Sequence, residues 1–236
     1  VDSARLLEKG RLITLRPHPR FAPFPRHRHN YVEIIYMCAG STTHHVNDAD
    51  KVVLRQGELL LLNQHAFHAV DRAGEGDVAV NFIVLPPFFD AAMRMLPADN
   101  LLWDFLTGSL RRNSGDGDYL HFRVSDILPV QNLMENMVWT LVHSQPNLHQ
   151  INQTTMGLLF LQLLEYTDRL ELPRRPRNDN ARVLHVLREI EDNYQNASLT
   201  SCADHLGMSA ANLSRLVRQT TGRTFQQLLQ QRPVGQ

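Results

Sequence analysis

Residues 199–225, LTSCADHLGMSAANLSRLVRQTTGRTF, decide how the C-terminal part of this chain folds. Apolar side chains recur there at helical spacing, at Leu199, Ala203 and Leu206, and predict a short helix with one apolar stripe. Gly207 suits the turn that ends this helix, because glycine adopts a left-handed backbone conformation without strain. Ser209 can cap a second helix by accepting a hydrogen bond from a free backbone N–H group. The stretch therefore predicts two short helices joined by a tight turn.

The second predicted helix has an apolar side and a polar, basic side. Its apolar residues, Leu213, Leu216 and Val217, are expected to face the core. Ala211, Ser214 and Arg215 share one outer face and are expected to contact base edges in the major groove of double-stranded DNA. Ser209, Asn212 and Arg218 suit phosphate contacts, which set the register of a helix on DNA. An ordinary helical hairpin with solvated Arg and Ser residues is the simpler alternative.

Residues 183–232 resemble the first half of the DNA-binding domain of AraC/XylS-type regulators. The resemblance rests on four segments: IEDNY at 190–194, LGMS at 206–209, LSRL at 213–216 and TGRTF at 221–225. It implies a helix-turn-helix that binds DNA. Family members carry two such units joined by a linker helix, which Pro233 would break in this chain. We therefore expect a DNA-binding domain truncated within that linker, as a fragment, a truncated gene product or a single-unit form.

Composition fits a protein with two globular domains in a reducing compartment. The chain has 236 residues, of which 43% are hydrophobic and 20% charged, as in folded rather than disordered proteins. Its two cysteines, Cys38 and Cys202, fall in different predicted domains and do not suggest a disulfide framework. No apolar run approaches the ~18 residues of a membrane span, and the N-terminus lacks a secretory signal. We expect a cytoplasmic protein with no membrane partner.

Charge contributes little to the predicted DNA binding. The formal net charge of the whole chain is zero, and residues 182–232 contain six arginines against four acidic residues. Few phosphate contacts predict weak non-specific binding with a shallow salt dependence. The DNA-binding hypothesis therefore depends on the helix pattern.

The N-terminal half has the pattern of a β-rich domain. Short β-branched and aromatic runs between turn residues predict strands at 32–38, 42–46, 51–54, 58–62 and 77–85, which is typical of a sandwich or barrel. Helical patterns follow at 87–96, 100–107, 126–144 and 152–171. A polar, proline-broken stretch then marks a domain boundary. We predict an α+β fold: a β-barrel with a helical hairpin in residues 1–172, a linker at 173–180, and an all-α helix-turn-helix domain in residues 181–236.

A histidine-rich segment resembles the first cupin motif, HxHx3Ex6G, with His27, His29, Glu33 and Gly40 at its fixed positions. The second cupin motif is present in part. Gly57 and His68 match it, whereas Asn63, His65 and Arg72 replace its Pro, Gly and Asn. Since residues two apart on a strand share a face, His27 and His29 should project together with Glu33. The resemblance implies a cupin-like barrel in which His27, His29, Glu33 and His68 surround one site that suits a divalent transition metal.

The same region can also form an effector pocket that needs no cofactor. The sensor domains of AraC-type regulators resemble cupins and often keep this pattern for structural reasons or for ligand contact. The resemblance therefore implies that His29, Tyr31, Glu33 and His68 could bind a sugar through hydrogen bonds. Ile35 and Met37 should lie on the same strand face. His44 and His45 are expected to be surface residues at a strand edge, and His205 a packing or phosphate-facing residue.

The two halves together predict a ligand-responsive, DNA-binding transcription regulator that senses a sugar or related small metabolite and is not an enzyme. The alternative is a metal-dependent cupin enzyme of the dioxygenase or isomerase class. A third possibility is a sensor that has lost DNA binding and acts through mixed dimers. We expect a homodimer, because apolar positions exceed what one core face needs, at Leu133, Met137, Val138, Leu141, Leu159 and Leu163. The same positions could instead pack entirely on the chain's own barrel.

Overall fold

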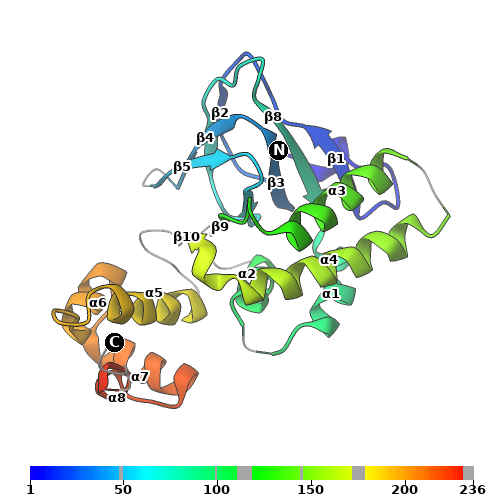
Figure 1. The fold of residues 1–236 in the computed structure, drawn as a ribbon. Coiled ribbons are helices and arrows are strands. Elements are labelled where there is room, and N and C mark those ends of the chain that lie inside the picture. Colours follow the sequence, from blue (N-terminus) through cyan, green and yellow to red (C-terminus); the bar gives the residue numbers. More distant parts are fainter. Residues whose placement is uncertain (48–49, 99, 111–118, 144–145, 172–178, 231–236) are drawn as a thin grey trace. The chain divides into compact units, whose positions relative to one another are not determined.

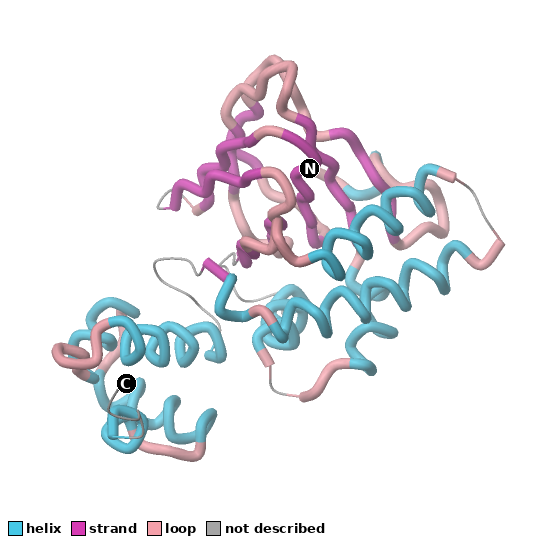
Figure 2. The backbone as a smooth tube through the Cα atoms, viewed as in Figure 1, coloured by secondary structure: helices cyan, strands magenta, loops and turns pink. Residues whose placement is uncertain are grey.

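A computed structural model describes residues 1–47, 50–98, 100–110, 119–143, 146–171 and 179–230 of the protein. The chain divides into two compact units, Val1–Pro173 and Arg174–Gln236, which are described separately. The first unit contains both strands and helices, and the second contains helices alone (Figures 1 and 2). The predicted α+β class is confirmed.

Two antiparallel sheets make up the β-structure of the first unit. The larger sheet has six strands in the order β1 (Ile13–Pro17), β8 (Val78–Val84), β3 (Val32–Ala39), β6 (Leu59–Leu62), β9 (Tyr119–Phe122) and β10 (Leu170–Glu171). The smaller sheet has four strands in the order β2 (Phe24–His27), β7 (His68–Val70), β4 (Ser41–Val46) and β5 (Asp50–Arg55). Ile35 and Leu60 from the larger sheet share a core cluster with Val46 and Leu54 from the smaller one. The sheets therefore face each other, with this core between them.

Helices cover the outer face of the larger sheet. They are α1 (Asp90–Met95), α2 (Leu101–Leu110), α3 (Leu128–Val142) and α4 (Leu148–Glu165), and α4 packs against both α1 and α3. Every residue of β3 from Val32 to Met37 is buried, because alternate side chains face the smaller sheet and the helices. The Tyr36 hydroxyl, for example, donates to Oε1 of Gln131 on α3 at 2.8 Å. Strand β4 instead alternates between buried and more exposed positions, so the smaller sheet has a solvent face.

The predicted helix over 152–171 is wrong at its C-terminal end. Helix α4 ends at Glu165, and Leu170–Glu171 form β10, which pairs with Phe122 and His121 of β9. The sequence pattern also misses β1, β2, β7 and β9. These strands are three to five residues long, and pairing with distant strands rather than a local pattern defines them.

The second unit contains the predicted helix-turn-helix. Its helices are α5 (Asp179–Asp192), α6 (Leu199–Leu206), α7 (Ala210–Thr221) and α8 (Phe225–Gln230), packed around a core that includes Val186, Ile190, Ala203, Leu213 and Val217. Gly207 ends α6 with a φ of 66°, in the left-handed region that the sequence predicts for it. Ser209 caps α7, since its Oγ accepts from the Asn212 backbone N–H at 3.3 Å.

The predicted linker at 173–180 is only partly within the described residues. Asp179 and Asn180 belong to α5 rather than to a linker, while residues 173–178 lie outside the part of the chain that the structure describes. Pro233, expected to break a linker helix, also lies outside the described residues.

Candidate functional site

A small cavity between the sheets of the first unit is lined by all of the residues predicted to bind an effector or a metal. Its volume is about 150 Å³. The polar side chains that line it are Arg16, His18, His27, His29, Tyr31, Glu33, His68 and Asn81, and its apolar lining includes Phe24, Val70 and Ile83. His27, His29, Tyr31, Glu33 and His68, all named from the sequence, therefore border one space.

The residues reach the cavity from both sheets, which differs from the predicted single strand. His27 ends β2 and pairs in register with His68 of β7 in the smaller sheet. Glu33 lies on β3 of the larger sheet, opposite Leu62 and Ile83. His29 lies between β2 and β3, where the chain passes from one sheet to the other. The prediction that these residues share one strand is wrong. They still border one cavity, because the chain crosses between the sheets at His29.

Three atoms converge at the centre of the site. Nε2 of His29 and Nε2 of His68 are 3.2 Å apart. Oε2 of Glu33 is 3.5 Å from the first nitrogen and 3.4 Å from the second. All three side chains are buried. His27 lies beside them, with its ring centroid 4.2 Å from that of His68.

A chain of buried hydrogen bonds holds the Glu33 carboxylate. Asn81 Nδ2 donates to Oε1 of Glu33 at 2.9 Å. Asn81 Oδ1 accepts from Nδ1 of His18 at 2.8 Å, and this contact fixes the orientation of the amide. Among the described residues, Oε2 of Glu33 has no hydrogen-bond partner. One carboxylate oxygen is thus fixed, and the other faces His29 and His68.

Burial controls the charge state of these groups. It lowers the pKa of His29 to about 3 and also lowers the pKa of His68, so both rings are neutral at pH 7. Burial raises the pKa of Glu33 to about 7, against the Asn81 hydrogen bond, which favours the carboxylate. Each neutral imidazole keeps one lone pair that can accept a hydrogen bond or bind a metal. The site is therefore weakly charged and rich in acceptors.

Sequence reasoning missed three residues in and around this site. Asn81 and His18 are described above, and the signal for Asn81 was a polar residue within the apolar run of β8. His44 was expected at the surface, but it is fully buried and its ring stacks 5.9 Å from that of His68. Its alternation with buried Thr42 and Val46 could have indicated this. His45 is exposed as predicted and pairs with Asp71 at 3.0 Å.

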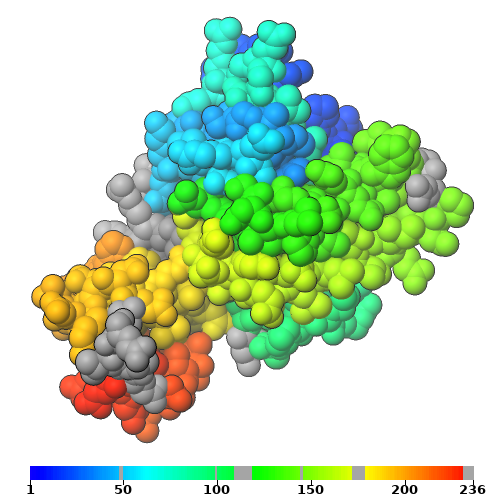
Figure 3. Space-filling view, viewed as in Figure 1, coloured from blue at the N-terminus to red at the C-terminus, as the bar shows by residue number. Residues whose placement is uncertain are grey.

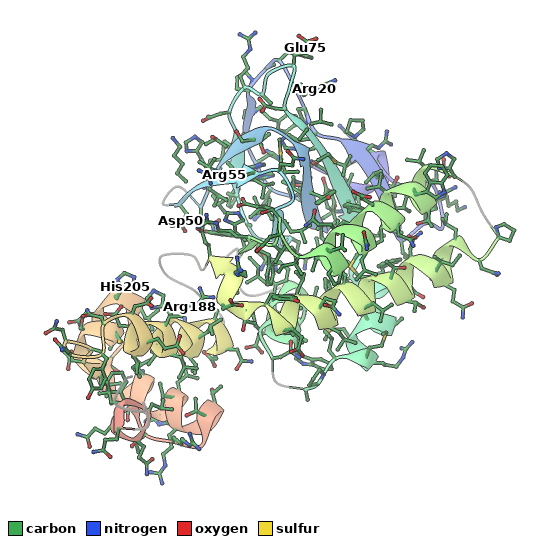
Figure 4. All side chains as sticks on the ribbon, in the orientation of Figure 1. Arg20, Asp50, Arg55, Glu75, Arg188 and His205 are labelled. Atoms are coloured by element: carbon green, nitrogen blue, oxygen red, sulfur yellow. The ribbon has the colours of Figure 1, made fainter. Side chains whose placement is uncertain are left out.

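The second unit presents the predicted DNA-contacting residues on the surface of α7. Ala211, Asn212, Arg215 and Arg218 are exposed, and Ser214 is half-buried. The opposite side of the helix packs into the core through Leu213 and Val217, whereas Leu216 is only partly buried. Ser209 lies just before α7 with its Oγ engaged as the cap. His205 is exposed on α6 (Figure 4). Its ring centroid lies 4.8 Å from that of His185.

The six apolar positions predicted to form a dimer contact are buried or half-buried. Met137, Leu159 and Leu163 are buried within the first unit, so they are not available to a partner. Leu133, Val138 and Leu141 are half-buried. The apolar side chains of α3 that do face solvent are Leu128, Trp139 and Val142, which are 66%, 60% and 63% exposed. Figure 3 shows α3, in green, on the open surface of its unit.

No helix within the described residues combines the length and apolar character needed to cross a membrane.

Both parts of the chain match known families. Residues 8–99 match the AraC-like ligand binding domain, and residues 190–230 match the bacterial regulatory helix-turn-helix proteins of the AraC family. The HTH-type transcriptional activator RhaS of Enterobacter sp. (strain 638) is 25% identical over 221 residues, covering 92% of this chain and 73% of the relative. RhaS of Klebsiella pneumoniae (strain 342) is 23% identical over 231 residues, covering 94% and 76%. Among solved structures, an apo variant of ToxT from Vibrio cholerae strain SCE256 has a TM-score of 0.49 and 11% identity, covering 94% of this chain and 80% of that chain.

Proposed function

The chain belongs to the AraC family of bacterial transcription regulators, and on this basis we propose that a small effector binds in the cavity of its first unit and that α7 of its second unit contacts DNA. The first unit is called the sensor unit below, and the second the DNA-binding unit. The observation that carries the proposal is the exposed face of α7, with Arg215 and Arg218, on a capped helix-turn-helix core. Such a helix fits the major groove of DNA.

The cavity limits the size and chemistry of the effector. Its volume of about 150 Å³ is well below the ~300–1,000 Å³ typical of pockets for drug-sized ligands. Imidazole, carboxyl, amide and phenol groups line it, so a compact ligand with several hydroxyl groups could satisfy them. A sugar or a related small metabolite is the class we expect, with His29, Tyr31, Glu33 and His68 as its contacts.

Two copies of the chain are expected to act together. A single helix-turn-helix with few basic residues binds weakly, and pairing two of them raises the effective concentration of the second on DNA. The exposed stripe of Leu128, Trp139 and Val142 on α3 is the surface we assign to this contact. An effector then alters DNA binding if it binds two arrangements of the dimer with different affinity.

We place this regulator in the cytoplasm, where its DNA lies. Because the curated relatives are transcription activators, we favour a regulator over the alternative of a metal-dependent cupin enzyme.

Selection from random DNA duplexes tests the proposal with the full chain. We expect an enriched motif, and in a dimer two half-sites whose centres lie about 10 base pairs apart. Effector binding is tested by thermal denaturation with a panel of monosaccharides, since a ligand that binds only the folded state raises its stability. Failure to enrich any sequence would contradict the DNA-binding role and favour a sensor that acts through mixed dimers.

A further inference from the structure

Arg16 brings a permanent positive charge to the cavity, since no other arginine or lysine of the described residues lines it. It lies on β1 directly opposite Asn81 of β8, so both side chains leave the larger sheet on the face that borders the cavity. Its Nη2 donates to the Leu6 carbonyl at 2.9 Å, and no carboxylate of the described residues pairs with it. The remaining N–H groups of the guanidinium can therefore bind an anion that enters the cavity.

His18 supplies a hydrogen-bond acceptor beside this cation. It lies two residues after Arg16 and lines the same cavity. Its Nδ1 donates to Asn81 Oδ1 at 2.8 Å, because the amide nitrogen of Asn81 is turned toward Glu33. Burial lowers the pKa of His18 and keeps the ring neutral, so the lone pair lies on Nε2, which is buried and has no partner among the described residues. Such an atom can accept from a ligand hydroxyl, whereas it repels a carboxylate.

The other end of the cavity also offers acceptors. Glu33 lies on β3, two strands from Arg16 on β1, with β8 between them. Because neighbouring strands are about 4.8 Å apart, the backbones at these two positions are separated by at least about 10 Å. Oε2 of Glu33 is buried without a hydrogen-bond partner among the described residues, and it faces Nε2 of His29 and of His68. Hydroxyl groups of a ligand could donate to Glu33, but an anionic group would be repelled there.

We infer that the effector is a polyhydroxy carboxylic acid, such as a sugar acid, whose carboxylate binds Arg16 and whose hydroxyl groups reach His18 and Glu33. A planar carboxylate can accept two parallel N–H bonds from a guanidinium, which a hydroxyl of a neutral sugar cannot. The difference between the two ends of the cavity gives the ligand one orientation. The inference rests on the proposed function in that the effector enters this cavity, and it narrows the effector from sugars in general to their acids.

Binding is measured on the full chain by thermal denaturation and isothermal titration calorimetry. The panel contains gluconate, galactonate, glucuronate and galacturonate, each beside its neutral sugar, glucose or galactose, and the phosphate ester of that sugar. At least one acid should bind about 10–100-fold more tightly than its neutral sugar, because hydrogen bonds to charged groups contribute about that much. Tightest binding by a phosphate ester or by a neutral sugar, or no binding by any acid, would overturn the inference.

Two matched variants test the role of Arg16. Arg16→Gln removes the charge and should weaken binding of the acid by about 10–100-fold, without changing the affinity for the neutral sugar. Arg20→Gln is the control and should leave both affinities unchanged. Arg20 is also exposed and also donates to one backbone carbonyl, that of Glu75 at 3.2 Å, but it does not line the cavity (Figure 4). Unchanged binding of the acid by Arg16→Gln, or equal loss in both variants, would overturn the inference.

A conservative variant separates anion binding from a structural role of Arg16. Arg16→Lys keeps the charge but loses the paired N–H groups, so the acid should bind more tightly to it than to Arg16→Gln and less tightly than to the parent. Thermal denaturation without ligand measures the stability of each variant. If Arg16→Gln does not fold, Arg16→Lys takes its place, with weaker binding of the acid expected and unchanged binding counting against the inference.

The same preparations separate this inference from the proposed function. A chain that selects a DNA motif but binds no acid overturns the inference and leaves the DNA-binding regulator intact. A chain that binds an acid through Arg16 but selects no DNA sequence supports the inference and contradicts the proposed DNA-binding role.

Discussion

Glu171 and His121 are joined at the edge of the larger sheet, where Nδ1 of His121 donates to Oε2 of Glu171 at 3.0 Å. The other ring nitrogen, Nε2, donates to Oε2 of Glu58 at 2.9 Å. Because both nitrogens face carboxylates, the ring is held as the imidazolium ion. Arg123 also bonds to Glu171, at 2.9 Å. The cluster fixes β10, which contains the last described residues of the sensor unit.

The protonation of this cluster stabilises the sensor unit only within a pH window. Burial alone would lower the pKa of His121, but the bonds to Glu171 and Glu58 outweigh it and raise the pKa. The bond from His121 is the main reason that the pKa of Glu171 falls to about 2. A raised histidine pKa adds stability below the unfolded value of ~6.5, and this is lost as pH rises through the folded value. A lowered carboxyl pKa adds stability above ~4.3, which is lost as pH falls toward the folded value.

We therefore predict that His121→Gln destabilises the sensor unit most between about pH 4.3 and pH 6.5, by about 2 kcal/mol. The difference from the parent protein should shrink at alkaline pH, where His121 loses its charge in the parent as well. Urea unfolding followed by tryptophan fluorescence measures this unit alone, because Trp103 and Trp139 both lie in it. His45→Gln is the matched control. The same pH dependence in both variants would contradict the prediction.

The turn of the helix-turn-helix gives a prediction about the DNA-binding unit. Gly207 has a φ of 66°, and no heavy atom of the described residues lies within 4 Å of an added Cβ. Gly207→Ala should therefore destabilise the unit through backbone strain alone, by about 1 kcal/mol. Gly207→Asn should cause a smaller loss, because asparagine tolerates the left-handed region. Hydrogen exchange of the α6 and α7 amides measures the stability of the unit in both variants. Equal protection in the parent, Gly207→Ala and Gly207→Asn would contradict this prediction.

The DNA-binding unit could be predicted from the sequence because its signals are local. Gly207 and Ser209 act on helix ends within four residues of themselves, and the apolar spacing of α6 and α7 is visible in one short segment. For the cavity, the sequence predicted which residues take part but not how the fold brings them together. Spacing identified His27, His29 and Glu33, but their meeting depends on a crossing between sheets that spacing does not encode.

Long-range partners explain what the sequence did not predict. Asn81 contacts Glu33 and His18, which lie 48 and 63 residues away in the chain. Residues 170–171 form a strand only because β9 is there to pair with them. His44 is buried because the larger sheet covers its face of β4, and a histidine pair alone gives no sign of this.

The exposed stripe of α3 predicts how dimerisation can be disrupted. Trp139→Glu places a charge where the proposed interface has its largest apolar side chain, and we expect the dimer to weaken by about 2 kcal/mol or more, about 30-fold in dissociation constant. The fold should persist, because Trp139 is 60% exposed. Phe21→Glu, at a loop residue that is 55% exposed, is the control. Analytical ultracentrifugation measures both, and a parent chain that remains monomeric would rule out this surface as a dimer contact.

Arg215 and Arg218 test whether α7 uses different residues to contact bases and phosphates. Arg215 lies on the face with Ala211, so we expect it to reach base edges, whereas Arg218 is expected to contact phosphate. Arg215→Ala should weaken binding to the selected DNA by about 1–3 kcal/mol and relax the preference at one base pair. Arg218→Ala should weaken binding equally on all sequences and reduce the salt slope by about 1. Fluorescence anisotropy on the selected duplex and its single-base variants, at several salt concentrations, distinguishes the two effects.

The control is Arg55→Ala, at an exposed position on β5 of the sensor unit, which should change neither the affinity for DNA nor its salt dependence (Figure 4). If Arg215→Ala weakens binding equally on all sequences, Arg215 contacts phosphate rather than a base edge. The other residues of the exposed face would then recognise the bases.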